Sequence, residues 1–252
     1  MEHITSRKNR IVNHLKNLSA DSDYRRNACE YVCDGEKTLK EALMFGAEVK
    51  SVLWGSQPYF EIPKGIEQYI CPIELMQYVS PLKNSQGPVF SIRIPDYDDL
   101  SEKQITTAIV LENVQDPGNV GTVIRTANAM GIDVVILVGD CADLYNPKTI
   151  RATMGGIFRQ CVIEMNIDEL KYYVNQKELR LFGAALSDIS IDIRNISMKK
   201  IAVAVGSEGR GLSSELLKIC DGQLIIPMKP DSESLNAAVA ASIIMWEMNR
   251  FD

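Results

Sequence analysis

Residues 226–243 read IPMKPDSESLNAAVAASI, and this stretch decides how the C-terminal half of the chain folds. An apolar run at 224–226 predicts a short strand, which a loop with two prolines and several hydroxyl or acidic residues follows. The loop leads into a predicted helix whose first turns are almost entirely small residues. Because a surface helix normally carries residues such as Lys, Glu and Leu, we expect another backbone or a ligand to press closely against this segment.

Composition limits the classes of protein that the chain can belong to. Its hydrophobic content of 46% and charged content of 24% are typical of a globular protein. We predict no membrane span, because no apolar run approaches the roughly 18 residues that one needs, and the N-terminus lacks the apolar core of a signal peptide. A cytoplasmic protein is therefore expected. The net charge of −6 disfavours nucleic-acid binding by bulk charge, although local basic patches remain compatible with it.

The cysteines and histidines predict no metal site. The six cysteines are scattered and include no C-x-x-C pair, and the two histidines both lie near the N-terminus. We interpret the cysteines as reduced, structural thiols, which suits a cytosolic compartment.

A polar, acidic stretch at 95–104 separates two predicted α/β domains. In the first, at 1–95, helical patterns around Leu15 and Leu39 alternate with strand-like runs at 49–54, 69–71 and 89–94. The second spans 105–252 and alternates helical segments with strand-like runs at 107–111, 134–138, 181–185, 201–205 and 224–226. Runs that are apolar on both faces indicate a parallel sheet covered by helices on both sides. In such sheets ligands bind beyond the carboxyl ends of the strands.

One informative motif, at 112–127, follows the first of these strands. Pro117-Gly118 predicts a turn, and the helix that follows has an apolar stripe that includes Val120 and Ile124. Arg125 lies off that stripe. Taken alone it reads best as a surface arginine, but one turn into a post-strand helix it is also well placed to hold a phosphate or ribose.

Two further motifs follow later strands. Residues 206–213 read GSEGRGLS, whose glycine order is neither the dinucleotide-binding G-x-G-x-x-G nor a P-loop. A nucleotide-dependent oxidoreductase and an NTPase are therefore disfavoured. In the segment 226–243, Ser234 or Asn236 is a natural helix N-cap. A cap does not explain the alanine-rich run that follows it.

Taken together, these motifs resemble the SpoU (TrmH-type) branch of the SPOUT methyltransferases. The family patterns correspond to residues 119–127, 206–212 and 226–240, and residues 145–158 are similar to the family's connecting segment. The resemblance implies an α/β fold with a deep C-terminal trefoil knot, a rare feature in proteins. It also implies a homodimer with the active site at the subunit interface. S-adenosylmethionine is the implied cofactor, bound at Gly206, Ile226, Met228 and Leu235.

The implied reaction is methyl transfer to a ribose 2′-hydroxyl of RNA, expected to be ribosomal RNA. A transfer RNA substrate is one alternative, and a catalytically idle RNA-binding assembly protein is another. The resemblance assigns Arg125 the central catalytic role, with Asn119, Glu208, Ser234 and Asn236 as its hydrogen-bonding partners. Because a guanidinium stays protonated in proteins and is a poor base, we expect Arg125 to orient a target phosphate and stabilise the developing alkoxide.

One position departs from the family pattern. Many relatives have glycine where this chain has Pro230, and proline fixes φ and removes an N–H donor. A stiffer loop is therefore expected at 229–233.

Residues 1–95 resemble the substrate-binding domain that often precedes this methyltransferase domain and has a ribosomal RNA-binding protein fold. The similarity is carried by residues 33–43. We expect RNA contacts from local basic groups, because affinity for RNA comes largely from its phosphates. The candidates are Arg7, Lys8, Arg10, Arg25 and Arg26.

Overall fold

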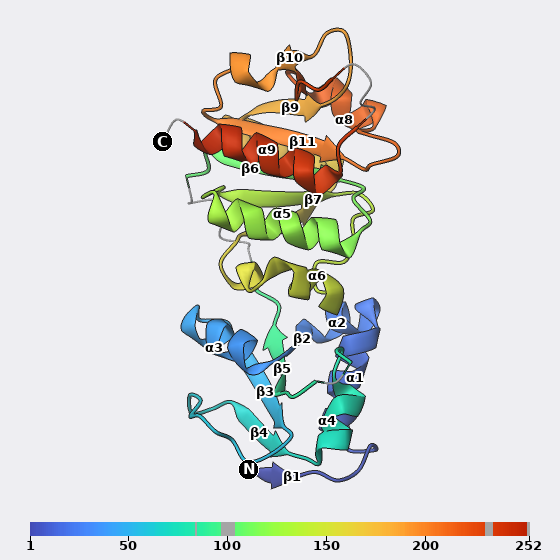
Figure 1. The fold of residues 1–252 in the computed structure, drawn as a ribbon, viewed down its shortest axis with the longest axis vertical. Coiled ribbons are helices and arrows are strands. Elements are labelled where there is room, and N and C mark those ends of the chain that lie inside the picture. The colour runs from blue at the N-terminus through green and yellow to red at the C-terminus, as the bar shows by residue number, and fades with distance from the viewer. Residues whose placement is uncertain (84, 97–103, 230–233, 251–252) are drawn as a thin grey trace. The chain divides into compact units, whose positions relative to one another are not determined.

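The computed structural model describes the whole chain except residues 84, 97–103, 230–233 and 251–252. The chain divides into two compact units, each built on its own β-sheet (Figure 1). The first unit contains Met1–Asp96 together with Tyr145–Arg151, and the second contains the remaining residues.

In the described residues, the first unit has a five-stranded sheet with the order β1-β4-β3-β5-β2. Strand β5 runs antiparallel to β2 and β3, whereas β1, β4 and β3 are parallel. The strands predicted at 49–54, 69–71 and 89–94 are confirmed, with small shifts at their ends. The bounds are β1 (Glu2–His3), β2 (Glu30–Asp34), β3 (Val49–Trp54), β4 (Glu67–Ile70) and β5 (Val89–Arg93).

Strand β2 was not predicted from the sequence. Both of its ends, Glu30 and Asp34, are charged, and only the three residues between them are buried. A buried stretch of three residues is too short to show the alternation that identifies a half-buried strand.

The helices of the first unit are built on short apolar stripes. Asn9 caps the first of them, because its side-chain oxygen accepts a hydrogen bond of 2.9 Å from the N–H of Ile11. Leu15 and Leu18 are fully buried, as the helical pattern predicts. The helices are α1 (Arg10–Ala20), α2 (Ser22–Ala28), α3 (Glu36–Met44) and α4 (Ile73–Val79).

The described part of the second unit contains a seven-stranded sheet with the order β10-β12-β9-β11-β6-β7-β8. Every pair of neighbouring strands is parallel, which confirms the predicted parallel sheet. The bounds are β6 (Thr107–Glu112), β7 (Val134–Val138), β8 (Val162–Met165), β9 (Arg180–Ala184), β10 (Ile191–Asp192), β11 (Ile201–Gly206) and β12 (Gly222–Ile225).

Helices cover both faces of this sheet. On one face, α7 and α8 contribute Leu170, Val174 and Leu216 to a core shared with the central strands. On the other face, α5 and α9 lie side by side (Figure 1), and Ser242 Oγ donates to Thr126 Oγ1 at 3.4 Å. The helices of this unit are α5 (Pro117–Ala129), α7 (Ile167–Gln176), α8 (Ser214–Ile219) and α9 (Ala237–Asn249). Helix α6 (Pro147–Thr153) begins in the Tyr145–Arg151 segment that belongs to the first unit.

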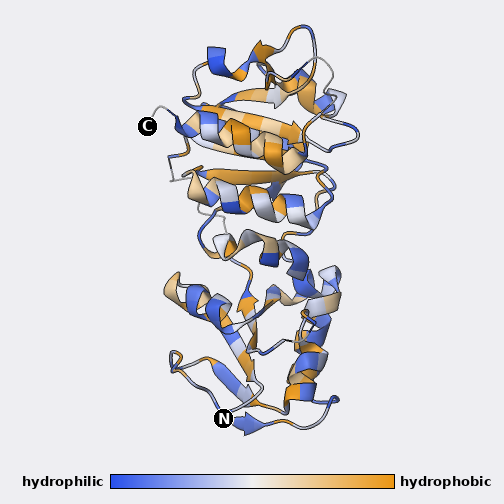
Figure 2. Cartoon of the chain, in the orientation of Figure 1, coloured by the Kyte–Doolittle hydropathy of each residue, from blue (hydrophilic) through white to orange (hydrophobic). Residues whose placement is uncertain are grey.

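Burial explains why the central strands could be predicted and the edge strands could not. All five residues of β7 are buried, and the colours of the central strands show them as largely apolar (Figure 2). Strand β8 is an edge strand with an exposed Glu164, and β10 has only two residues. Neither produces the continuous apolar run of a strand buried on both faces.

Asp133 fastens the start of β6 to the start of β7. Its Oδ2 accepts hydrogen bonds from the N–H groups of Thr106 and Thr107 at 2.7 and 2.9 Å. The same oxygen accepts from the hydroxyls of these threonines, at 2.9 and 3.2 Å.

We predict that Asp133→Ala lowers the free energy of unfolding by about 2–4 kcal/mol, because several donors lose a charged acceptor at once. Urea denaturation followed by circular dichroism measures this change. Asp188→Ala, at an exposed loop position, is the matched control and is expected to stay within about 0.5 kcal/mol of the parent. Equal stability of the two variants would contradict the role assigned to Asp133.

Candidate active site

Three post-strand segments of the second unit meet at one edge of the sheet. They follow β6, β11 and β12, whose carboxyl ends share that edge because the strands are parallel. These are the three segments that carry the sequence motifs.

The segment after β11 forms a tight glycine turn, Gly206–Gly211. Ser207 and Gly211 form an isolated antiparallel bridge, with the N–H of Gly211 donating to the carbonyl of Ser207 at 2.8 Å. Gly211 has a φ of +66°, a conformation that favours glycine. At Gly206, an added Cβ would lie 2.2 Å from the carbonyl carbon of Gly211. The turn therefore needs glycine at both of its ends.

A buried carboxylate ties this turn to the end of β6. Glu112 is only 2% exposed, and it accepts hydrogen bonds from the N–H and the hydroxyl of Ser213, at 2.7 and 2.6 Å. Ser213 in turn caps α8 by accepting from the N–H of Leu216 at 3.1 Å. The position of the glycine turn is thus fixed from both sides.

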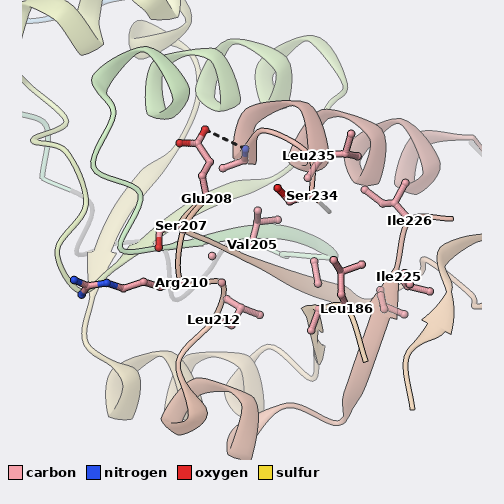
Figure 3. A pocket seen from close by; sticks show the side chains of 18 of the residues that line it. Leu186, Val205, Ser207, Glu208, Arg210, Leu212, Ile225, Ile226, Ser234 and Leu235 are labelled. Carbon is pink, nitrogen blue, oxygen red and sulfur yellow. Dashed lines mark hydrogen bonds between the residues drawn. The ribbon is translucent and has the colours of Figure 1, made fainter. Parts of the chain in front are cut away.

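Glu208, on this turn, binds the other two post-strand segments. Its Oε1 accepts a hydrogen bond of 2.6 Å from the side-chain amide of Asn119 and another from that of Asn236. It also accepts from the N–H of Ala237 at 3.4 Å, and Asn236 Nδ2 lies 3.2 Å from Asn119 Oδ1. Figure 3 shows Glu208 pointing toward the start of α9. Three of the predicted catalytic residues are therefore assembled into one network.

Asn236 has a second role, as the N-cap of α9. Its Oδ1 accepts hydrogen bonds from the N–H groups of Ala238 and Val239, at 3.0 and 3.2 Å. The capping role expected for Ser234 or Asn236 thus belongs to Asn236, and the same amide also serves the network.

Arg125 lies apart from this network within its own chain. It is exposed on α5, and Gly156 lies against its backbone, so that a Cβ on Gly156 would be 3.4 Å from Arg125 Cα. Among the residues that the structure describes, Arg125 forms no hydrogen bond with Asn119, Glu208, Ser234 or Asn236.

A pocket of about 380 Å³ opens beside the network. A volume of this size lies within the usual range for small-molecule sites. Its walls include all four residues predicted to bind the cofactor. Glu208 and Ser234 also line it, and both are labelled in Figure 3. The four are Gly206, Ile226, Met228 and Leu235.

Sequence reasoning missed other residues of this pocket. Leu186, which follows β9, and Ile225, at the end of β12, add to its apolar lining, and Arg210 lines its mouth. Leu186 follows a strand whose end lies at the same sheet edge as the motifs, so its position after a predicted strand was the signal that could have identified it.

The basic residues proposed to contact RNA belong to the first unit. Arg7, Lys8, Arg10 and Arg26 are exposed, and the Arg7 guanidinium lies 4.4 Å from the centroid of the Tyr78 ring. Arg25 requires a correction, because it is only 3% exposed and its Nη1 donates to the carbonyl of Leu18 at 2.7 Å. Arg25 is therefore a structural residue and not a surface contact.

The remaining predictions concern metals, thiols and the proline loop. In the described part of the chain, no cluster of His, Cys, Asp or Glu side chains is arranged to hold a metal ion, and no helix there has the length and apolarity to cross a membrane.

All six cysteines are free. Burial raises the pKa of Cys71 to about 11 and that of Cys220 to about 12, so these thiols stay protonated. Pro230 lies outside the described residues.

Known proteins resemble this chain in sequence and in fold. A relative from Bacillus subtilis, described as 23S rRNA (guanosine(2553)-2'-O)-methyltransferase RlmP, is 30% identical and aligns over 98% of this chain and 99% of its own. An rRNA methyltransferase crystal structure from Sinorhizobium meliloti matches with a TM-score of 0.89 and 27% identity, over 99% of this chain and 97% of that one. The AdoMet-bound structure from the same organism matches with a TM-score of 0.87 and 26% identity, over the same shares.

The family model described as "SpoU rRNA Methylase family" matches residues 106–246. This range covers more than half of the chain and contains the glycine turn, the Glu208 network and the pocket. The chain belongs to the SpoU rRNA Methylase family.

Proposed function

We propose that this protein is an S-adenosylmethionine-dependent methyltransferase that modifies a ribose 2′-hydroxyl of ribosomal RNA in the cytoplasm. The observation that carries the proposal is the network of Asn119, Glu208 and Asn236 beside a pocket lined by Gly206, Ile226 and Leu235. The 23S rRNA 2'-O-methyltransferase activity in the name of the Bacillus subtilis relative and the AdoMet-bound structure from Sinorhizobium meliloti support it.

The pocket suits S-adenosylmethionine. Leu186, Ile225, Ile226 and Leu235 offer apolar surface to an adenine ring, and Gly206 lets backbone approach the ligand closely. When bound there, the cofactor supplies an electrophilic methyl group.

The Glu208 network prepares the substrate side of this pocket. Because one carboxylate oxygen of Glu208 holds two amide side chains and a backbone N–H, Asn119 and Asn236 are kept in fixed orientations. Fixed polar groups of this kind lower the reorganisation needed when charge develops during a reaction. Ser234, at the pocket wall, adds a hydroxyl that can bind the ribose.

Arg125 acts on the RNA in this proposal. Its guanidinium orients a phosphate next to the target ribose and stabilises the negative charge that develops on the ribose oxygen. Because Arg125 forms no hydrogen bond with the network of its own chain, we assign its action to an active site completed by a second subunit.

The groove between α5 and α9 supports a homodimer. This groove, of about 480 Å³, is lined by Asn119, Asn236, Val239 and Trp246, among others. Val239 is 47% exposed and Trp246 is 60% exposed, so α9 presents apolar surface along this groove. Because the groove reaches Asn119 and Asn236, a second copy seated there would lie beside the network.

The order of the strands supports a trefoil knot. The connection from β9 to β11 contains β10, which pairs with one edge of β12, while β9 pairs with the other edge. This connection therefore passes around β12. The chain that follows β12 forms α9, which packs on β11 and β6. In the proposed fold, the chain reaches α9 by passing through the loop that the connection from β9 to β11 forms.

The first unit is the proposed RNA-binding domain. Arg7, Lys8, Arg10 and Arg26 are exposed there, and Lys16 lies 5.0 Å from the centroid of the Tyr78 ring. In a chain with a net charge of −6, such a local group of cations can attract phosphates where the whole protein does not.

We predict that the purified protein transfers a methyl group from S-adenosylmethionine to ribosomal RNA and that Arg125→Lys lowers kcat roughly 100-fold, because the forked donor is lost. Mass spectrometry of nuclease-digested RNA identifies the 2′-O-methyl product, and calorimetry checks that cofactor binding is retained. Arg194→Lys, at an exposed arginine paired with Asp192, is the control. Near-normal turnover of Arg125→Lys would exclude the forked role, and a product only on transfer RNA would change the assigned substrate.

Neutralising Arg7, Lys8, Arg10 and Arg26 to Gln together is expected to weaken RNA binding and to make the dependence of log Kd on log salt shallower. Fluorescence anisotropy with ribosomal RNA fragments at several salt concentrations measures both quantities. A control with the same loss of charge replaces exposed lysines of the second unit, Lys171, Lys199, Lys200 and Lys218. Equal losses in the two variants would leave only a net-charge effect and refute a local RNA site.

Trp246→Glu is expected to convert the dimer into a monomer of 28.1 kDa, because a charge in an apolar interface loses its hydration. Sedimentation equilibrium measures the mass. Tyr172→Glu on α7, where the parent side chain is 65% exposed, is the matched control and should stay dimeric. A parent protein that sediments as a monomer would contradict the proposed interface.

A further inference from the structure

Arg210 is a charged residue that lines the pocket and has no role in the reaction proposed above. It lies on the glycine turn, two residues after Glu208, and its side chain is exposed at the mouth of the pocket. A charged side chain on a catalytic loop can simply be solvated, so its position and its surroundings decide whether it has a role.

The backbone that carries Arg210 is held in place. The bridge between Ser207 and Gly211 closes the turn on both sides of it. The contact of Gly206 with the backbone of Gly211 leaves no room for the turn to shift inward, and Glu112 holds Ser213 just beyond it. A side chain that starts from a fixed backbone loses less conformational entropy when it binds a ligand.

The direction of the side chain separates it from the cofactor walls. Figure 3 shows Arg210 extending away from Leu186, Ile225 and Ile226, which lie on the opposite side of the pocket. Glu208, on the same turn, points toward α9 instead. On this turn, Glu208 therefore accepts hydrogen bonds from the network, whereas the Arg210 guanidinium points outward at the pocket mouth.

The charge of Arg210 is available to a ligand. Within the described ranges, no carboxylate forms an ion pair or hydrogen bond with it. The nearest acid along the turn, Glu208, is occupied by the amides of Asn119 and Asn236. A planar guanidinium with free donors fits the paired oxygens of a phosphate.

We propose that Arg210 binds a backbone phosphate of the bound RNA strand at the pocket mouth and so helps to set the position of that strand. This inference rests on the proposed function. The carboxylate of the bound cofactor could use the same guanidinium chemistry, but the outward direction of the side chain favours the RNA. Arg210 is thus a substrate-binding residue of the methyltransferase unit, distinct from the basic group of the first unit.

The test compares Arg210→Gln and Arg210→Lys with the parent, with Lys218→Gln on an exposed position of α8 as the matched control. For Arg210→Gln we expect a roughly 10-fold higher KM for RNA and a salt slope of RNA binding lower by about 1. Its affinity for S-adenosylmethionine, measured by calorimetry, should stay within about twofold of the parent. Arg210→Lys should recover part of the RNA affinity, because it keeps the charge without the fork.

Two results would overturn this proposal. An unchanged KM and salt slope for Arg210→Gln would remove the phosphate contact, and a loss of cofactor affinity as large as the loss of RNA affinity would assign Arg210 to the cofactor carboxylate. RNA binding is measured without cofactor as well as during turnover. A parent protein that binds RNA but transfers no methyl group would therefore count against the proposed function while still testing Arg210.

Discussion

One carboxylate oxygen holds the candidate site together. Glu208 Oε1 accepts hydrogen bonds from Asn119 on α5, from Asn236 before α9 and from the N–H of Ala237. These groups belong to segments that are distant in sequence and meet only because parallel strands deliver them to one edge of the sheet. Hydrogen bonds to a charged acceptor are stronger than those between neutral groups. The shape of the pocket therefore depends on a charge placed among amides.

The alanine-rich start of α9 can now be understood from its neighbours. Ala237 and Ala240 line the pocket, whereas Ala238 lines the groove between α5 and α9. Larger side chains on these turns would fill one space or the other. Small residues thus serve two surfaces of one helix, and this explains why the segment lacks the Lys, Glu and Leu of an ordinary surface helix.

Much of this arrangement could be predicted from the sequence, for a physical reason. Strands buried on both faces, such as β7 and β11, have continuous apolar runs, and the motifs that follow such strands must lie at the sheet edge. Edge strands such as β8 and β10 leave no such run. Arg25 was misassigned because counting charges in a short helix does not show which way a side chain points. The separation of Arg125 from the network also depends on three-dimensional packing, which no local pattern encodes.

The length of the glycine turn sets the positions of the side chains that it carries. The bridge between Ser207 and Gly211 closes the turn, and a Cβ added to Gly206 would lie 2.2 Å from the carbonyl carbon of Gly211. The positions of Glu208 and Arg210 relative to the end of β11 are therefore fixed by the length of the turn. Insertion or deletion of a residue inside the turn would alter the reach of both side chains together. The length of this turn is consequently as strict a requirement as the identity of its residues.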